Sequence, residues 1–371
     1  MSKKYATTNV VNAVKVFDYW GTLVDFRPFG NGHINDTYLV RFRFEGKIRK
    51  YILQRINKDV FKKPHEVMSN IMGVTSYLRR MIKESGGDPE RETLNVIKTK
   101  DGKGFYVDGY GDYWRSFVYI GDTVSLELPE DNNDFYQAAV AFGSFQKNLG
   151  DYPADTLYET IPNFHNTPVR YQNFLKAVEE NASGRADTAL AEIEFVKARC
   201  DFTAVLEDAH KNGLLPKRVT HNDTKINNVL LDKDTREPVC VVDLDTIMPG
   251  YSVNDFGDSI RFGASTAAED ERDLSKVHFD INLFETYTRG FLNGCGGRLC
   301  ESEIMLLPEG AKMMTLECGM RFLADYIEGD VYFKTAYADH NLVRCRTQFK
   351  LVEEMEEKWD EMKEIVKKYS K

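Results

Sequence analysis

The residues of this chain that are best suited to chemistry lie within 221–245, which reads HNDTKINNVLLDKDTREPVCVVDLD. Phosphoryl transfer needs a carboxylate that accepts the proton of the attacking hydroxyl, and oxygen ligands for the Mg²⁺ ion that accompanies the nucleotide phosphates. Asp223 is the candidate base, and Asn228, five residues later in the same loop, is a candidate Mg²⁺ ligand. Asp243, at the end of an apolar segment, is the second candidate ligand. The spacing therefore predicts phosphoryl transfer from ATP with Mg²⁺.

A β-hairpin is predicted between these residues, because two short apolar runs, 229–231 and 239–242, flank a polar turn. Such a hairpin returns Asp243 to the mouth of the loop that carries Asn228, so that the two side chains share one metal ion. Asp245 follows by two residues and, on a strand, shares a face with Asp243, where it supports a loop or a second ion. A single acidic residue is typical of a turn in which its side chain hydrogen-bonds to the nearby backbone. The ordered set of Asp223, Asn228, an apolar hairpin and Asp243 is much rarer.

Length, charge and hydropathy limit the class of protein. The 371 residues exceed one typical core and predict two domains, a nucleotide-binding lobe at 1–120 and a catalytic and substrate-binding lobe at 121–371. The net charge of −9 disfavours nucleic acid as a partner. The sequence has no run of 18 apolar residues and no secretion-signal pattern, so we expect a cytoplasmic protein without a membrane partner.

The pattern of the first 120 residues indicates a small, mainly β lobe. Alternating apolar residues over 37–44 and 50–56, joined by Glu45-Gly46, predict a hairpin, and Pro64 then begins a helix with an apolar period of 3.6 residues. Beyond residue 121 the chain is mainly helical, and the catalytic hairpin is expected to be its only β structure. The fold class predicted is α+β. Further strands are expected at 95–99, 104–107 and 113–120, and helices around 135–149, 168–181, 187–210, 270–293, 301–326 and 340–369.

Residues expected to hold the nucleotide lie at both ends of the small lobe. Gly30, Asn31 and Gly32 precede the hairpin, and we interpret them as a loop whose backbone N–H groups approach phosphate oxygens. Tyr119 and Ile120 lie where the β lobe ends and are expected to form the hinge to the helical lobe. ATP is thus expected to be bound between this loop and the hinge.

One position departs from the usual kinase pattern. The second hairpin strand should carry a phosphate-binding lysine, and by alternation that position falls on Gln54. Either the loop and the metal ions hold the phosphates alone, or Lys50, Arg55 or another cation reaches the site. Glu66, near the start of the following helix, is a candidate partner, although a solvent-facing glutamate is the simpler interpretation.

Two charged groupings in the second lobe have simple structural interpretations. Asp255 and Asp258, in NDFGDSIRF, are typical of helix caps or of charge partners for Arg261. Glu317 and Arg321 are four residues apart on a predicted helix, which is typical of a surface ion pair.

Taken together, these motifs resemble a known family. GNGHINDTYLV, YILQRIN, HNDTKINNVLLD, VVDLDTIMPG and NDFGDSIRF are similar to N-acetylhexosamine 1-kinases, within the aminoglycoside phosphotransferase and choline kinase superfamily. The resemblance implies a bilobal protein-kinase-like fold and transfer of phosphate from ATP to the anomeric hydroxyl of GlcNAc or GalNAc. It implies that Asp223 is the base, that Asn228 and Asp243 bind Mg²⁺, and that Arg321 and Tyr332 contact the sugar together with Asp223 and Asp243. A glutamine at position 54 fits this branch.

Two alternatives remain open from the sequence. The first is a kinase of the same fold for another small hydroxyl compound, such as choline, homoserine, methylthioribose or an aminoglycoside. The second is a non-catalytic nucleotide-binding scaffold, favoured by the absent lysine and opposed by the complete set of base and metal ligands. The oligomeric state is not predicted.

Overall fold

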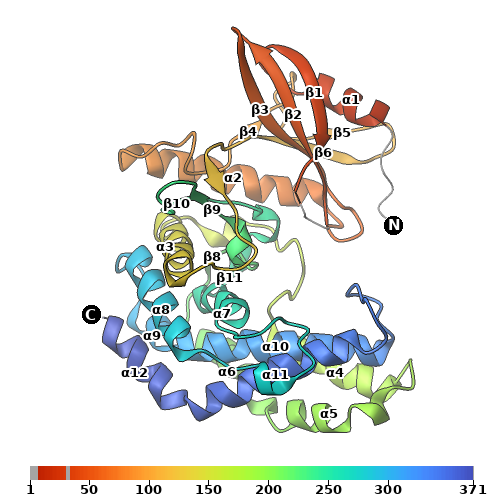
Figure 1. The fold of residues 1–371 in the computed structure, drawn as a ribbon, viewed down its shortest axis with the longest axis vertical. Helices are drawn as coiled ribbons and strands as arrows, with labels where there is room; N and C mark the ends of the chain where they lie inside the picture. Colours follow the sequence, from red (N-terminus) through yellow and green to blue (C-terminus); the bar gives the residue numbers. More distant parts are fainter. Residues whose placement is uncertain (1–6, 31–33, 371) are drawn as a thin grey trace.

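The N-terminal part of the chain is built around one antiparallel sheet (Figure 1). The structure, a computed structural model, describes residues 7–30 and 34–370. The sheet has six strands in the order β1-β2-β3-β6-β4, with β5 paired to β6. The elements of this part are α1 (Thr7–Val16), β1 (Thr22–Pro28), β2 (Asp36–Phe44), β3 (Lys47–Arg55), α2 (Pro64–Glu84), β4 (Val96–Ile97), β5 (Tyr106–Val107) and β6 (Tyr113–Val118).

The hairpin of β2 and β3 confirms the prediction for this region. Glu45 and Gly46 form its turn, and both have positive φ angles of 51° and 76°, as a type I′ turn requires. β3 begins at Lys47, earlier than predicted, because its ladder to β2 continues up to the turn. β6 lies antiparallel on the other side of β3, with Gln54 opposite Arg115. Residues that lie opposite each other on neighbouring strands point to the same face of a sheet.

Helices cover both faces of this sheet. Tyr51 and Leu53 point from β3 into a core shared with α1, whereas Ile52 points to the other side, where α2 packs. Pro64 stands in the first turn of α2, as predicted, where its missing N–H leaves no bond unmade. The sequence does not predict α1 or β1. β1 reads TLVDFRP and is largely exposed, so it lacks the alternation of a half-buried strand.

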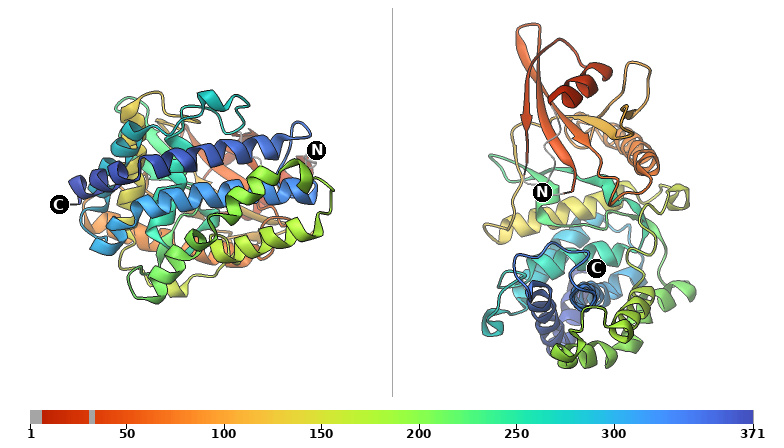
Figure 2. Two further views of the ribbon diagram at one scale, coloured as in Figure 1. Left: turned by 90° about the horizontal axis from the view of Figure 1, so that it is seen from below. Right: turned by 90° about the vertical axis from the view of Figure 1, so that its right-hand side faces the viewer.

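The larger C-terminal part is mainly helical. Its elements are β7 (Thr123–Val124), α3 (Asn132–Asn148), α4 (Thr167–Glu180), α5 (Leu190–Lys197), α6 (Val205–Lys211), β8 (Arg218–Thr220), β9 (Val229–Asp232), β10 (Pro238–Val241), β11 (Met248–Gly250), α7 (Ser252–Gly263), α8 (Ile281–Cys295), α9 (Glu301–Met305), α10 (Leu307–Glu328), α11 (His340–Glu357) and α12 (Trp359–Tyr369). The largely buried α10 packs against α4, α7 and α11, and Figure 2 shows these long helices side by side below the sheet. The predicted α+β, protein-kinase-like architecture is confirmed, whereas the lobe boundary at residue 120 stays a prediction.

Several predicted helices are shorter than their periodicity suggests. The helix expected at 187–210 is two helices, because a 3₁₀ turn at Cys200–Ala204 separates α5 from α6. The helix expected at 270–293 begins only with α8, where the Asp280 carboxylate accepts hydrogen bonds from the first turn. The helices expected at 301–326 and 340–369 are each split in two, into α9 with α10 and into α11 with α12.

Two small sheets correct the prediction that the catalytic hairpin is the only β structure of this part. β9 and β10 form the predicted hairpin, and β7 adds a third strand to it. β8 pairs antiparallel with β11, with Thr220 opposite Met248. Because β8 leads into the loop 221–228 and β11 follows the loop 242–247, this pairing sets the two loops side by side.

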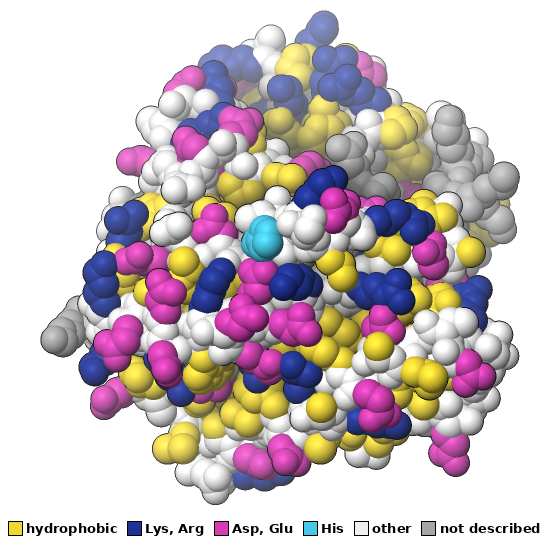
Figure 3. Space-filling model, turned by 60° about the horizontal axis from the view of Figure 1, so that its bottom comes forward, with side chains coloured by type: hydrophobic (Ala, Val, Ile, Leu, Met, Phe, Trp, Pro, Cys, Tyr) yellow, Lys and Arg dark blue, Asp and Glu magenta, His cyan; other side chains and the backbone are white. Residues whose placement is uncertain are grey.

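Charged side chains of both signs are interspersed on the face of the molecule seen in Figure 3. On this face the net charge of −9 is therefore spread rather than collected into a field of one sign. Among the residues that the structure describes, no helix is long and apolar enough to cross a lipid bilayer.

Candidate active site

The candidate base lies in the loop between β8 and β9, which ends in a 3₁₀ turn, Ile226–Asn228. The Asp223 side chain retains 34% of its exposure, so a substrate can reach it. Asn228 donates from Nδ2 to the main-chain oxygen of Asp223 at 2.8 Å and to its Oδ2 at 3.3 Å. Lys225, which the sequence analysis does not single out although it stands between the two, places Nζ 3.3 Å from Asp223 Oδ1. The structure thus brings base and amide ligand together.

A buried carboxylate on α7 holds the backbone of this loop. Asp255 accepts the N–H groups of His221 at 2.9 Å and Asn222 at 2.8 Å, one on each oxygen, and Asn222 has a positive φ of 64°. Gln146 of α3 donates to the same carboxylate at 2.8 Å. Burial raises the pKa of Asp255, although these hydrogen bonds oppose the rise. The prediction that Asp255 caps its helix is therefore wrong, because the carboxylate reaches across to the loop.

The neighbouring carboxylate and the loop histidine complete this support. Asp258 accepts the N–H of Thr224 at 2.9 Å and forms the predicted ion pair with Arg261 at 3.0 Å. His221 bonds through Nε2 to the carbonyl of Val242 at 2.9 Å and accepts the N–H of Asp223 at Nδ1 over 3.3 Å. These two bonds imply that the proton is on Nε2. The ring therefore joins the loop of the base to the segment that carries Asp243.

Replacing the buried Asp255 carboxylate is expected to disturb catalysis, although Asp255 is not proposed to contact the substrate. Asp255→Asn places an NH₂ group opposite one of the two loop N–H donors, and we expect a kcat reduced by about tenfold or more and a lower Tm, because a buried donor is left unpaired. Gln146→Met is the matched control, since it removes a buried bond to the same carboxylate but leaves both loop N–H groups paired. Steady-state kinetics and thermal denaturation check this; equal kcat losses in both variants contradict the role of Asp255.

Asp243 and Asp245 do not share a strand face, which corrects that expectation. β10 ends at Val241, and Asp243 takes a left-handed backbone conformation (φ 58°, ψ 59°) before a 3₁₀ turn, Leu244–Thr246. The Asp243 residue is exposed, whereas Asp245 is buried at 3% exposure. The two carboxylates therefore have different surroundings and are expected to have different tasks.

The donor set around Asp243 fits Mg²⁺. Asn228 donates through its amide NH₂ to Asp223, so its amide oxygen is not used in these bonds and could serve as a metal ligand. Although Asp243 is accessible, crowding by protein atoms, followed by the charges of Asp245 and Asp223, raises its pKa to about 7. A cation at this position relieves that crowding of charge. Within residues 7–30 and 34–370 there is no cluster of three His, Cys, Asp or Glu side chains to hold a metal ion, and Mg²⁺ needs only one or two protein ligands when waters and phosphates complete its shell.

The predicted phosphate loop is described only at its start. Gly30 follows β1 with a positive φ of 77°, a conformation that strains any residue with a Cβ atom. The position a Cβ would take at Gly30 has no atom within 4 Å. Asn31 and Gly32, the other two residues of the prediction, lie outside the described residues.

The two predicted hinge residues follow β6 and lead into β7, which belongs to the sheet of the catalytic hairpin. Ile120 is buried, and the N–H of Tyr119 donates to the carbonyl of Lys50 at 3.1 Å. The ring of Phe29, next to Gly30, meets the Tyr119 ring edge to face at 5.8 Å between centroids. The start of the phosphate loop and the hinge therefore lie close together.

The strand position without a lysine is next to a buried arginine. Gln54 accepts through Oε1 a hydrogen bond from Nε of Arg115 at 2.9 Å. Arg115, on β6, is 2% exposed and forms an ion pair with Asp245. Lys50 lies over the hinge tyrosine, and Arg55 forms an ion pair with an aspartate of β2. Sequence reasoning missed Arg115, although a charged residue inside the apolar strand YWRSFV is an available signal.

The two predicted sugar-contacting residues lie together near the end of α10. The guanidinium carbon of Arg321 is 5.7 Å from the centre of the Tyr332 ring and 5.6 Å from that of Phe164. With Arg170 of α4 they surround a recess of about 280 Å³ that is lined mainly by α4 and α10. Arg170 donates from Nη2 to the carbonyl of Phe164 at 3.0 Å. This bond joins Arg170, which lines the recess, to the residue that precedes His165.

The surface ion pair predicted for Glu317 and Arg321 is wrong, because Glu317 is 1% exposed and binds other residues. It accepts from Thr167 Oγ1 at 2.6 Å and lies 2.9 Å from His165 Nδ1. Burial pushes the pKa of Glu317 upward, but His165 and then Arg321 outweigh burial and lower it. The second nitrogen of His165 lies 3.3 Å from the carbonyl of Asn222, next to the base. A buried chain of contacts therefore connects the recess to the catalytic loop.

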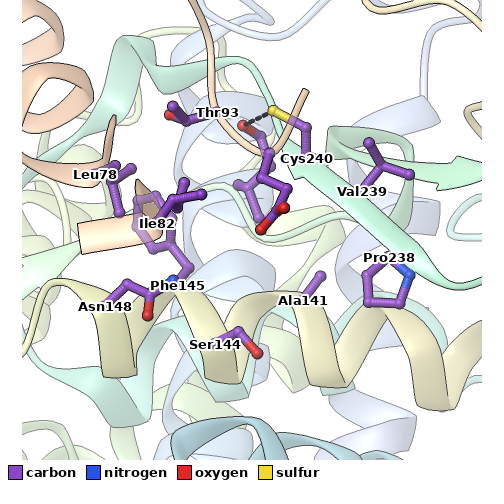
Figure 4. Close-up of a pocket in the computed structure, with 12 residues that line it drawn as sticks. Leu78, Ile82, Thr93, Ala141, Ser144, Phe145, Asn148, Pro238, Val239 and Cys240 are labelled. Atoms are coloured by element: carbon purple, nitrogen blue, oxygen red, sulfur yellow. Dashed lines mark hydrogen bonds between the residues drawn. The ribbon is translucent and has the colours of Figure 1, made fainter. Parts of the chain in front are cut away.

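The cavity in Figure 4 lies behind the catalytic hairpin rather than at its mouth. It has a volume of about 160 Å³, and its lining side chains come mainly from α2, α3 and β10, among them Leu78, Phe145 and Cys240. Burial raises the pKa of the Cys240 thiol, which therefore stays protonated. Because none of the predicted site residues lines this cavity, we do not assign it to catalysis.

The model of the phosphotransferase enzyme family matches residues 25–289 of the chain. The microcompartment-associated aminopropanol kinase superposes with a TM-score of 0.61 at 17% identity, over 96% of this chain and 99% of that chain. An aminoglycoside phosphotransferase from Alicyclobacillus acidocaldarius gives 0.61 at 11% identity over 96% of both chains. The choline kinase from Cryptosporidium parvum gives 0.55 at 14% identity over 93% of both chains. The structural matches establish the fold, and the family match covers most of the chain. The chain therefore belongs to the phosphotransferase enzyme family.

Proposed function

We propose that the chain transfers phosphate from ATP, with Mg²⁺, to the anomeric hydroxyl of an N-acetylhexosamine, GlcNAc or GalNAc. The observation that supports this most directly is the connected site around Asp223. Asp223 is hydrogen-bonded to Asn228, and its charge acts on Asp243. Contacts from Asn222 through His165 and Glu317 lead toward Arg321 and the recess. Family membership supports the phosphoryl transfer, and the resemblance of the motifs supports the sugar.

In this mechanism Asp223 accepts the proton of the anomeric hydroxyl as its oxygen attacks the γ-phosphorus. The new oxygen–phosphorus bond forms while the bond to the β,γ-bridging oxygen breaks, and ADP leaves. An anomeric hydroxyl is more acidic than an ordinary alcohol, which reduces the demand on the base. Lys225 lies beside the base, and the charge of Asp223 raises the pKa of its ammonium group. As a fixed cation it stabilises charge on the transferred phosphoryl group.

The metal and nucleotide ligands are proposed by position. Asn228 and Asp243 hold Mg²⁺, which supplies charge stabilisation on the phosphate oxygens when bound. Gly30, Asn31 and Gly32 approach the phosphates through their backbone, and Tyr119 and Ile120 contact the base of the nucleotide at the hinge. Gln54 acts from the sheet through Arg115.

The recess suits a neutral sugar better than a cationic acceptor. Arg170 and Arg321 both line the recess, and burial, followed by the charge of Arg321, lowers the pKa of Arg170. A choline or aminoglycoside ammonium group would be repelled there, whereas ring hydroxyls and an acetamide oxygen accept hydrogen bonds from arginine. Tyr332, at 66% exposure, offers an aromatic wall. Three carboxylates, those of Glu180, Asp325 and Glu328, also line the recess, and that of Asp325 already accepts the N–H groups of Tyr332 and Phe333 at 2.7 and 2.9 Å.

The test is ³¹P NMR of the purified protein with Mg²⁺, ATP and one acceptor at a time. We expect a sugar 1-phosphate signal with GlcNAc or GalNAc, which gives both the reaction and the position of the phosphate. Choline, homoserine, methylthioribose and an aminoglycoside form the comparison panel. If only one of these compounds is phosphorylated, that compound replaces the sugar as the proposed acceptor, and the proposed kinase activity stands. Nucleotide binding with no product from any acceptor would favour the scaffold.

Removing Arg321 from the recess is expected to weaken binding of the acceptor and to leave binding of the nucleotide unchanged. Arg321→Ala removes hydrogen bonds from a charged donor, each worth about 1.5–3 kcal/mol, so KM for the sugar should rise about tenfold to hundredfold. KM for ATP should stay within about twofold, because none of the described residues that are proposed to hold the nucleotide lines the recess. Lys176→Ala, at the exposed rim of the recess, is the control and should leave both values unchanged. A larger change in KM for ATP would contradict the placing of the sugar.

A further inference from the structure

The ion pair that positions the phosphates in standard kinases has no equivalent at its usual place. That pair joins a lysine of the third strand to a glutamate of the following helix, and both must be in place for activity. Here the strand residue is Gln54, and Glu66 of α2 pairs with the lysine before its own helix at 2.9 Å. Further along α2, Asn70 points inward and donates to the carbonyl of Ile247 at 2.9 Å. The helix thus contacts the segment after Asp245 through an amide rather than a charge.

A cation and an acid that form such an ion pair are present, but they lie on other elements of the fold. Arg115 lies directly opposite Gln54 in the ladder of β3 and β6, so both side chains point to the same face of the sheet. The acid is Asp245, in the 3₁₀ turn of the C-terminal part, two residues after Asp243. Both charged residues are buried, at 2% and 3% exposure. The cation has moved by one strand, and the acid has moved from the helix to the segment that carries the metal ligand.

We propose that Arg115 is a positioning residue which, through its ion pair with Asp245, holds the metal-bearing segment 243–247 against the nucleotide-holding sheet. Gln54 orients the guanidinium through its bond to Nε at 2.9 Å. Asn35, which follows the phosphate loop, donates from Nδ2 to the other oxygen of Asp245 at 2.7 Å. One carboxylate of the C-terminal part is therefore held by two residues of the sheet part. Arg115 does not need to touch phosphate for this task.

This arrangement couples the position of the cation in the sheet to the position of the metal-bearing segment, which the usual pair does not do. A lysine and a glutamate in one lobe hold each other whether or not the lobes are closed. Arg115 and Asp245 belong to different parts of the fold, so their contact exists only when the sheet and the metal-bearing segment are in register. We therefore expect loss of the pair to weaken binding of the nucleotide and its metal ion, and to leave binding of the acceptor unchanged.

The test compares the neutral pair Arg115→Gln/Asp245→Asn with wild type, so that no buried charge is left alone. Isothermal titration with Mg²⁺ and the ATP analogue AMPPNP measures binding without any acceptor. We expect a Kd at least tenfold weaker and a KM for ATP raised to match, with KM for the acceptor unchanged and the circular dichroism spectrum retained. Arg49→Gln, an exposed arginine on β3, is the control. An unchanged Kd in the folded neutral pair would overturn the proposal.

A second variant covers failure of the neutral pair to fold. Arg115→Lys keeps a cation near Asp245, but a single nitrogen replaces the two that bond separately to Gln54 and Asp245, so the fixed orientation is lost. A raised KM for ATP at unchanged Tm supports the positioning role, whereas a wild-type KM for ATP overturns it. The inference rests on the nucleotide part of the proposed function only. If the wild-type protein does not bind AMPPNP with Mg²⁺, the proposed kinase activity is contradicted. If it binds AMPPNP but does not phosphorylate a sugar, only the proposed acceptor is contradicted.

Discussion

Asp223→Asn is expected to lower kcat by at least about a hundredfold while leaving the fold intact. General-base help contributes about 10²–10⁴-fold in enzymes, and an amide cannot accept the proton of the attacking hydroxyl. The fold should survive because the strongest local bond, from Asn228 Nδ2 at 2.8 Å, goes to the main-chain oxygen of residue 223 and not to its side chain. The loop is held instead by the carboxylates of Asp255 and Asp258.

The measurement is ADP release under saturating ATP and sugar, together with Tm. Asp234→Asn, at the exposed turn of the same hairpin, removes a carboxylate of the same chain segment and should keep wild-type kcat. KM for both substrates should change little, since the base acts in the transition state. A kcat within a few fold of wild type for Asp223→Asn would remove this residue from the role of base.

The parts of the fold that were predicted correctly are those that local patterns encode. Glu45-Gly46 between alternating strands specifies a hairpin, because a two-residue type I′ turn, with positive φ at both residues, matches the strand twist. Pro64 specifies the start of α2 for an equally local reason. The catalytic hairpin follows from two apolar runs and a polar turn. Where local patterns end, at the breaks inside the long helices, the predicted boundaries were wrong.

The parts of the site that were missed depend on contacts between distant residues. Asp255 is 34 positions from His221, Arg115 is 130 positions from Asp245, and His165 is 152 positions from Glu317. A carboxylate at the start of a helix has the same sequence signature whether it caps that helix or reaches a loop. Only the packing of α7 below β8 decides between the two. The proposed metal ligands and base could be named from the sequence because their spacing lies within one loop and one hairpin.

Asp243→Asn is expected to lower kcat strongly and, without metal, to stabilise the protein. A neutral amide is a weak ligand for Mg²⁺, and losing one stabilising group of a phosphoryl-transfer site lowers kcat by about 10²–10³-fold. Crowding by protein, Asp245 and Asp223 raise the pKa of Asp243 from 3.8 to about 7. A carboxyl group with a raised pKa binds more protons in the folded state, so the free energy of unfolding falls as pH rises between these two values.

Above pH 7 the metal-free wild type therefore carries the whole of this penalty, whereas the variant carries none. Because Asp243 is exposed, solvent screens part of the effect, and we expect the variant to melt about 1–3 °C higher at pH 8 in EDTA. The difference should shrink at pH 5.5, where wild-type Asp243 is largely protonated. Adding Mg²⁺ and ADP should reverse the order, because only the wild type gains binding free energy from the metal complex. A variant that melts lower than wild type in EDTA at pH 8 would mean that Asp243 is stabilised by protein partners, and an ion would then have no excess of negative charge to neutralise.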